Sequence, residues 1–265
     1  MHQKAKEIRA LTATCISALG AGHIGGSLSI VDVLTVLYYK HMNIDPKNPK
    51  MDARDRLVVS KGHSGPAVYA TLAHKGYFEK DELYTLNKFG TNLPSHCDMN
   101  KTPGVDMTTG SLGQGISCAL GMALAAKMRK TDEYIYAIIG DGESQEGQVW
   151  EAAMYASQKK LDNFIVFLDY NKYQLDGSTD SINALGDVYN KWKSFGFYTQ
   201  SIDGNDIDAI DEAILNAKNN KNAPSMIILN TIKGKGISFV EAAGENNHSM
   251  PITKEDLLIA LEELK

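Results

Sequence analysis

An aspartate flanked by glycines and an asparagine further along the chain are the residues whose types and spacing most clearly suggest chemistry. Asp141 lies in Gly140-Asp-Gly142 after the apolar run 134–139, and Asn171 follows a second apolar run, 164–168. Both runs have the length and composition of buried strands, and a helix-length segment separates them. Parallel strands joined by a helix end at the same edge of a sheet. Open α/β sheets bind ligands at that edge.

The side chains expected at this edge suit a divalent cation and a diphosphate. The carboxylate of Asp141 and the amide oxygen of Asn171 are hard ligands, and the backbone carbonyl of Tyr173 could complete the shell. Gly140 and Gly142 allow backbone N–H groups to approach phosphate oxygens closely. The alternative is structural, since aspartate and asparagine also favour helix N-caps and turns. The sequence therefore predicts a Mg²⁺ or Ca²⁺ site here, with this alternative open.

A second glycine-rich loop, Gly110-Ser-Leu-Gly-Gln-Gly115, precedes a helix expected at residues 112–130. Such a loop can bind an anion at the helix N-terminus or let a ring approach the backbone. Residues 115–126 carry almost no polar side chain, and a helix that is apolar on all sides is buried on all sides. The helix either lies inside this domain's own core or packs against a partner chain.

Four histidines occur in turn-like segments rich in glycine, proline or polar residues, namely His23, His63, His96 and His248. Loops on a rigid sheet often carry function. Their spacing does not match a metal site, so they are interpreted as donors of protons and hydrogen bonds. For any one histidine alone, a structural role is the alternative.

The elements that must position these residues alternate between strand and helix. This pattern predicts an α/β fold, with a single three-layer domain over residues 1–265 and a parallel sheet between helices. The expected strands are 57–60, 134–139, 164–169, 197–202 and 225–230. The expected helices are 1–20, 28–42, 63–75, 112–130, 145–160, 187–195, 206–219 and 253–264, the last with a capping box at Thr253 and Asp256.

Composition excludes several classes of function. The chain has 265 residues, of which 43% are apolar and 22% charged, and a formal net charge of −5. Its basic residues are scattered, so no nucleic-acid surface is expected. Its three cysteines form no disulfide framework and no metal-ligand spacing. No signal core and no run near the roughly 20 apolar residues of a membrane span occurs, so a cytoplasmic protein is expected.

Taken in order, the motifs resemble those of the N-terminal, diphosphate-binding half of transketolase, from about residue 5 to 252. Each motif alone is weak, whereas the ordered set is specific. The resemblance implies a thiamine-diphosphate-binding fold, a parallel sheet enclosed by helices. The motifs are Gly22-His23, Ser60-Lys-Gly-His63, Ser95-His96, Gly110-Ser-Leu-Gly-Gln-Gly115, Gly140-Asp-Gly-Glu-Ser-Gln-Glu146, Asp169-Tyr-Asn171, Leu175-Asp-Gly177 and Asn247-His248.

The resemblance also implies roles for individual residues. The metal ligands would be Asp141, Asn171 and the carbonyl of Tyr173. Thiamine diphosphate would contact His63, Gly110, Ser111, Leu112, Gly142, Glu143, Asn171 and His248. The catalytic set would be His23, His96 and His248, which bind and protonate sugar oxygens, and Glu146, an interface glutamate that links two cofactor sites.

Transketolases usually continue into a second α/β domain and a third domain. The resemblance therefore implies a separate C-terminal subunit that carries the pyrimidine-binding domain and the glutamate that activates the cofactor. A fragment of a longer enzyme is the alternative. If a separate subunit completes the enzyme, helix 112–130 would be an interface helix, and self-association through it would give a heterotetramer.

The activity that the resemblance implies is transfer of a two-carbon ketol unit from a ketose to an aldose, free or phosphorylated, as in the pentose phosphate pathway. Two alternatives stay open. One is a subunit of another thiamine-diphosphate enzyme, related to deoxyxylulose-phosphate synthase or to a 2-oxo-acid dehydrogenase. The other is a non-catalytic diphosphate-binding subunit.

Overall fold

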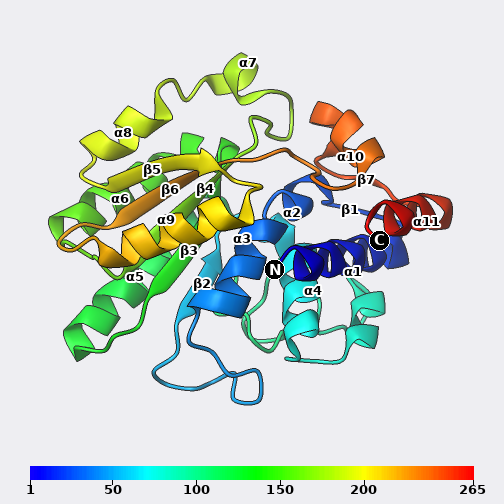
Figure 1. The fold of residues 1–265 in the computed structure, drawn as a ribbon, viewed down its shortest axis with the longest axis horizontal. Helices are drawn as coiled ribbons and strands as arrows, with labels where there is room; N and C mark the ends of the chain where they lie inside the picture. Colours follow the sequence, from blue (N-terminus) through cyan, green and yellow to red (C-terminus); the bar gives the residue numbers. More distant parts are fainter.

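A five-stranded parallel sheet forms the centre of the structure, a computed structural model that describes residues 1–265 (Figure 1). The strand order is β2-β3-β4-β6-β5. The strands are β2 (Arg56–Val59), β3 (Ile135–Gly140), β4 (Phe164–Tyr170), β5 (Tyr198–Asp203) and β6 (Ser225–Asn230). The predicted fold class and all of the predicted strands are confirmed, with shifts of about one residue at their ends.

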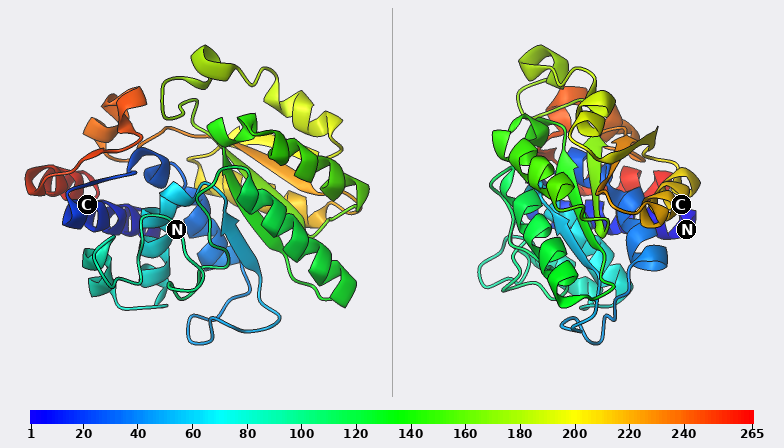
Figure 2. Two further views of the ribbon diagram at one scale, coloured as in Figure 1. Left: turned by 180° about the vertical axis from the view of Figure 1, so that it is seen from behind. Right: turned by 90° about the vertical axis from the view of Figure 1, so that its left-hand side faces the viewer.

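Helices cover both faces of the sheet, as the edge-on view in Figure 2 shows. The apolar residues of α1, α3, α4 and α9 pack on one face, and those of α5, α6 and α8 pack on the other. The α-helices are α1 (His2–Leu19), α2 (Gly25–Leu28), α3 (Val31–Val36), α4 (Gly65–Lys75), α5 (Gln114–Arg129), α6 (Gly147–Gln158), α7 (Thr179–Asn183), α8 (Val188–Ser194), α9 (Ile207–Asn219), α10 (Ser238–Ala242) and α11 (Lys254–Glu263). The remaining helical turns are η1 (Leu37–His41), η2 (Gly62–Ser64), η3 (Lys80–Thr85), η4 (Gly142–Gln145) and η5 (Gly244–Asn247).

Strand β3 shows why the sequence forms this sheet. All of its residues are buried, and their side chains alternate between the two cores. Tyr136 and Ile138 belong to the core with α1 and α4, whereas Ile135, Ala137 and Ile139 belong to the core with α5 and α6. A parallel strand covered on both faces needs apolar residues at every position, which explains the unbroken apolar run in the sequence.

The structure differs from the expectation in several short elements. The helix expected at residues 28–42 is divided into α2, α3 and the π-helical turn η1. Two short strands, β1 (Ala21–Gly22) and β7 (Met250–Pro251), were not predicted and pair antiparallel at opposite ends of the chain. The short helices α7 and α10 were also missed, because elements of five residues show no helical period. The β1–β7 pairing places the segments of His23 and His248 side by side.

At the C-terminus, α11 has the predicted capping box, in which Thr253 and Asp256 bond reciprocally. The helix packs on α1, as Figure 1 shows. No helix in the chain has both the length and the apolar character that crossing a membrane requires.

Helix α5 is buried on one side only. Ile116, Ala119 and Ala123 are completely buried, whereas Met128 is 76% exposed. A Cβ added to Gly121 would meet no atom within 4 Å. Within this chain the helix is therefore not enclosed by its own core, and the interpretation as an inner core helix is wrong. Its role as an interface helix stays a prediction.

Candidate active site

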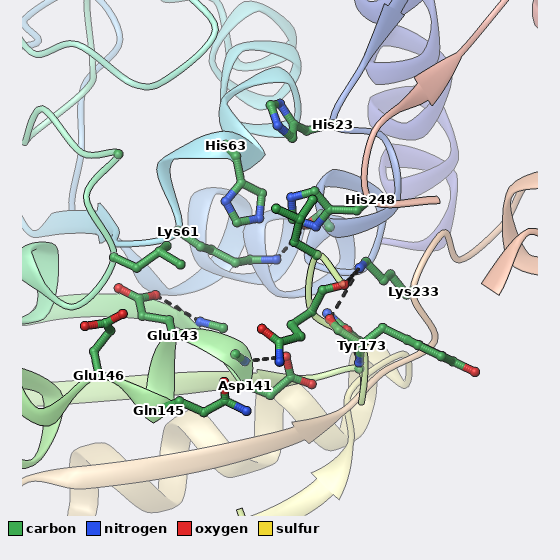
Figure 3. A pocket seen from close by; sticks show the side chains of 18 of the residues that line it. His23, Lys61, His63, Asp141, Glu143, Gln145, Glu146, Tyr173, Lys233 and His248 are labelled. Atoms are coloured by element: carbon green, nitrogen blue, oxygen red, sulfur yellow. Dashed lines mark hydrogen bonds between the residues drawn. The ribbon is translucent and has the colours of Figure 1, made fainter. Parts of the chain in front are cut away.

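A cavity of about 300 Å³ opens at the carboxyl edge of the sheet, where the polar ends of β2, β3, β4 and β6 meet. All of the residues predicted for the site line this cavity except Ser111, which is exposed on the glycine loop. In the view of Figure 3, the rings of His23, His63 and His248 occupy one side, and the carboxylates of Asp141 and Glu143 occupy the other. Segments far apart in the sequence thus supply a single pocket.

Asp141 follows β3 directly and is only 2% exposed. Its two carboxylate oxygens accept hydrogen bonds from the backbone N–H groups of Gly142 and Lys172. No cationic side chain forms a salt bridge with it. Burial, reinforced by the nearby Asp169 carboxylate, raises the pKa of Asp141 to about 7. The site therefore contains a buried carboxylate that lacks a paired countercharge.

Asn171 follows the neighbouring strand β4, as the sequence predicts. Its side-chain oxygen accepts a hydrogen bond from Tyr173 N–H at 3.1 Å. The carbonyl of Tyr173 accepts a hydrogen bond from the Lys233 ammonium at 3.3 Å. A cationic group thus already contacts one of the predicted metal ligands.

The donor set fits a hard divalent cation. It consists of one carboxylate, one amide oxygen and one backbone carbonyl, which are the ligand types that Mg²⁺ and Ca²⁺ accept. No cluster of three His, Cys, Asp or Glu side chains suited to a metal occurs in the chain, so amide and carbonyl oxygens have to complete such a shell. A bound cation would also supply the countercharge that Asp141 lacks.

A buried ion pair between Lys61 and Asp169 lies under the cavity and was missed in the sequence. The ammonium and carboxylate are 2.6 Å apart, and their side chains are 2% and 0% exposed. Lys61 also donates to the carbonyl of Gly26 at 2.7 Å. Lys61 comes just after β2, and Asp169 lies near the end of β4, each inside a motif that the sequence displays. Their position at strand ends was the signal that could have identified them.

Lys233 is the second missed cation, in the segment that follows β6. Burial, together with the charge of Lys61, lowers the pKa of Lys233 to about 8. Both ammonium groups line the cavity, so its floor is suited to an anion such as a diphosphate. A lysine followed by glycine just after a strand end, as in Ile232-Lys-Gly234, was the signal that could have identified it.

The four predicted histidines form one cluster. The ring centre of His23 lies 5.5 Å from that of His63, 5.7 Å from that of His96 and 5.4 Å from that of His248. Burial lowers the pKa of His23 and His63, and Lys61 adds to the effect at His63. Burial and Lys233 lower the pKa of His248 to about 4. These three rings are therefore neutral near pH 7, each with one nitrogen that donates and one that accepts.

We expect His248→Gln to weaken the dependence of folding stability on pH below neutrality. The unfolded histidine titrates near its ordinary value of 6.5 and the folded one near 4. The unfolded chain therefore binds the extra proton in this window, and stability falls as the pH drops from 6.5 towards 4. Asp141, whose pKa is raised, acts in the opposite sense in both proteins. The melting temperature of the variant should rise relative to that of the wild type as the pH falls through this window. A constant difference in melting temperature between the two proteins across the window would refute the lowered pKa of His248.

Glu143 lines the cavity, but its carboxylate is occupied by the protein. It accepts hydrogen bonds from the Ser60 hydroxyl, from Gly113 N–H at 2.8 Å and from Gly140 N–H at 3.1 Å. It thereby ties the glycine loop to the ends of two strands. These contacts favour positioning of that loop over direct contact with a cofactor.

The glycine loop itself lies tight against β2. A Cβ added to Gly115 would lie 2.6 Å from the Ser60 hydroxyl oxygen and 2.8 Å from the Ser60 Cα, closer than real contacts allow. Gly110 lies beside the His96 ring, which a Cβ would meet at 3.4 Å. The backbone at Gly110 therefore lies directly against the His96 ring, and its approach to a ring of the cofactor stays a prediction. Glu146 is exposed at the rim of the cavity, where a second chain could reach it.

Comparison with known proteins gives a consistent result. Residues 1–264 match the family model described as transketolase, thiamine diphosphate binding domain. The chain is 56% identical over 265 residues to the 6-deoxy-6-sulfo-D-fructose transketolase subunit SqwG of Clostridium sp. (strain MSTE9), covering 100% of this chain and 96% of that protein. It is 41% identical over 266 residues to a subunit of the apulose-4-phosphate transketolase of Actinobacillus succinogenes, again covering 100% and 96%.

Among solved structures, the transketolase of Campylobacter jejuni superposes with a TM-score of 0.92 at 33% identity. The match covers 99% of this chain and 42% of that one. The chain therefore spans about two fifths of the solved transketolase and nearly the whole length of the two subunit relatives.

Proposed function

The chain belongs to the transketolase family, and we propose that it is the diphosphate-binding subunit of a two-chain transketolase. The complex would transfer a two-carbon ketol unit from a ketose to an aldose. The observation that carries the proposal is the convergence of the cation ligands, the anion-binding lysines and the histidine cluster in one cavity. The family model includes thiamine diphosphate binding, and the ammonium groups and oxygen ligands that line the cavity suit the diphosphate end of that cofactor.

The divalent cation, Mg²⁺ first, would be held by Asp141, Asn171 and the carbonyl of Tyr173. The diphosphate would lie on Gly142 and between Lys61 and Lys233. The remaining proposed cofactor contacts in the cavity are His63, His248, Asn171, Gly110 and Leu112. Ser111, which is exposed on the glycine loop outside the cavity, is proposed as a further contact. Thiamine diphosphate, when bound, supplies the carbon nucleophile and electron sink of the reaction.

The residues of this chain then orient the sugar and move its protons. His23, His96 and His248 lie within one cluster, so they can hydrogen-bond neighbouring hydroxyls of one sugar chain. The rings of His23 and His248, which are neutral near pH 7, can accept a proton from one hydroxyl and return it to another. The cavity walls hold the reacting atoms in a fixed geometry, which accounts for a further part of the rate.

The pyrimidine-binding domain would come from a partner subunit. Both relatives are named as transketolase subunits, which supports a second chain. Residues 1–265 would form the diphosphate-binding domain. The exposed side of α5 would join two copies of this chain, giving a cytoplasmic heterotetramer. Glu146, exposed at the rim, would then lie at the boundary between chains.

The sugar preference can be tested directly. The complex should be assayed with 6-deoxy-6-sulfo-D-fructose, the ketose in the name of the Clostridium relative, and with fructose 6-phosphate as a phosphorylated pentose-phosphate-pathway ketose. Transfer of two carbons to an aldose from either donor supports the proposal. Absence of transfer with every ketose, despite cofactor binding, would refute it.

We expect substitution of His96 and substitution of His63 to have different effects on turnover and on cofactor affinity. His96→Ala should lower sugar turnover by about 10²–10⁴-fold, the range for loss of a general acid–base group, with near-normal cofactor affinity. His63→Ala should first weaken cofactor binding, and turnover should partly recover at high thiamine diphosphate. Turnover and cofactor affinity of both variants in the complex check this.

Thermal stability provides the control for this pair. If His96 only orders its loop, His96→Ala should lower the melting temperature and leave turnover nearly unchanged. That result would remove His96 from the catalytic set.

A further inference from the structure

Asn171 can act as a cation ligand only if its side-chain oxygen, and not its nitrogen, faces the cation. An amide has similar shape in both orientations, so its surroundings have to select one. One neighbour is Asp169, whose ionised carboxylate only accepts hydrogen bonds. The other is the backbone N–H of Tyr173, which only donates. The amide nitrogen therefore has to face Asp169, and the amide oxygen has to face the Tyr173 N–H group.

The structure shows the contacts that result. The Asn171 nitrogen donates to Asp169 Oδ2 at 2.8 Å, and the Asn171 oxygen accepts from Tyr173 N–H at 3.1 Å. The oxygen thus lies on the side of the Tyr173 residue, whose carbonyl is the third proposed ligand. An acceptor-only group behind the nitrogen makes the reversed orientation costly, because the amide oxygen would then face a carboxylate.

Asp169 is itself fixed in place and kept charged. It is completely buried and also accepts hydrogen bonds from Lys61 at 2.6 Å, from the Ser29 hydroxyl at 2.6 Å and from the Thr231 hydroxyl. The ammonium of Lys61 forms a buried ion pair with this carboxylate and supplies its countercharge. The carboxylate therefore cannot turn away from Asn171 without losing several other partners.

We propose that Asp169 is a positioning residue that orients the Asn171 amide so that its oxygen is presented to the divalent cation. This inference rests on the proposed function, since it assumes a cation at Asp141 and Asn171. It extends that function to a residue that would touch neither the cation nor the substrate. Groups that orient metal ligands in this way typically change metal affinity by about 10–100-fold when they are altered.

The test is a double-mutant cycle on Mn²⁺ affinity, measured in the presence of thiamine diphosphate with the full chain, alone and with its partner. Asp169→Asn keeps the shape but removes the charge that holds the Asn171 nitrogen. It should weaken Mn²⁺ binding by about 10–100-fold in the Asn171 background. In the Asn171→Asp background it should not weaken binding, because a carboxylate presents an oxygen in either orientation.

The cycle separates positioning from simple charge. If Asp169 acts only through its negative charge near the cation, Asp169→Asn should weaken Mn²⁺ binding equally in both backgrounds, and the proposal would be wrong. Thr231→Val is the matched control, because it removes a donor to the other oxygen of Asp169 without touching Asn171. It should leave Mn²⁺ affinity within about twofold, as expected for a change that leaves the orienting contact intact.

A measurement on the unaltered protein covers the case in which Asp169→Asn does not fold. The side-chain amide protons of Asn171, identified by their loss from the spectrum of Asn171→Asp, should exchange slowly with solvent. Rapid exchange of these protons in the wild-type chain would overturn the inference. No Mn²⁺ binding by the wild type with thiamine diphosphate, alone or with the partner, would instead overturn the metal assignment itself and the inference with it.

Discussion

Asp141→Ala is expected to abolish metal-dependent binding of thiamine diphosphate while leaving the fold intact. Asp141 supplies the only carboxylate of the proposed cation shell, and the remaining donors are a neutral amide and a backbone carbonyl. We expect the affinity for the cofactor with Mg²⁺ to fall by more than about 100-fold, beyond the range usual for groups outside the ligand shell. Calorimetric titration of the complex with cofactor at fixed Mg²⁺ measures this.

The fold should tolerate the change because Asp141 is a buried carboxylate with no salt bridge, held only by two backbone N–H groups. Removing it leaves those donors unpaired but also removes the cost of burying a charge. Asp176 is an exposed aspartate in the loop that follows β4, so Asp176→Ala is the control and should bind cofactor normally. Wild-type affinity in the Asp141→Ala protein would exclude Asp141 as a cation ligand.

The purified chain alone is expected to fold but to show no transketolase turnover, and addition of the partner chain should restore activity. The cavity is lined by residues that we propose to bind the diphosphate, the cation and the sugar, but we propose none of them to activate the pyrimidine ring. Circular dichroism of the single chain and a two-carbon transfer assay before and after mixing would measure both parts of this prediction.

Two controls sharpen this experiment. A mixture of the Asp141→Ala chain with the partner should stay inactive, which shows that the recovered activity uses the cavity described above. The partner alone should also be inactive. Robust turnover by the single chain, free of any partner, would contradict the two-chain proposal and would require a complete site within residues 1–265.

The sequence by itself determined the strands and the edge at which the site lies. Apolar runs such as 134–139 specify buried parallel strands, because every side chain of such a strand enters one of two cores. Chain order then places Asp141 and Asn171 after neighbouring strands, and the observed register pairs Gly140 with Asp169. The four histidines were identified in the sequence because turn-like surroundings mark loop positions.

The tertiary structure alone decided how these parts meet. The β1–β7 pairing joins segments at opposite ends of the chain and brings His23 beside His248. The ion pair of Lys61 with Asp169 also joins distant segments. No local pattern encodes such contacts, because periodicity reports only the burial of a segment and not its partner.

The direction of individual polar groups was likewise decided by packing. Glu143 lies in a motif that suggested cofactor contact, yet its oxygens bond to Ser60, Gly113 and Gly140. The amide of Asn171 is oriented by Asp169 and by the backbone of Tyr173. Residue type fixes which hydrogen bonds a side chain can form, but a buried donor or acceptor takes the partners that the fold places within reach.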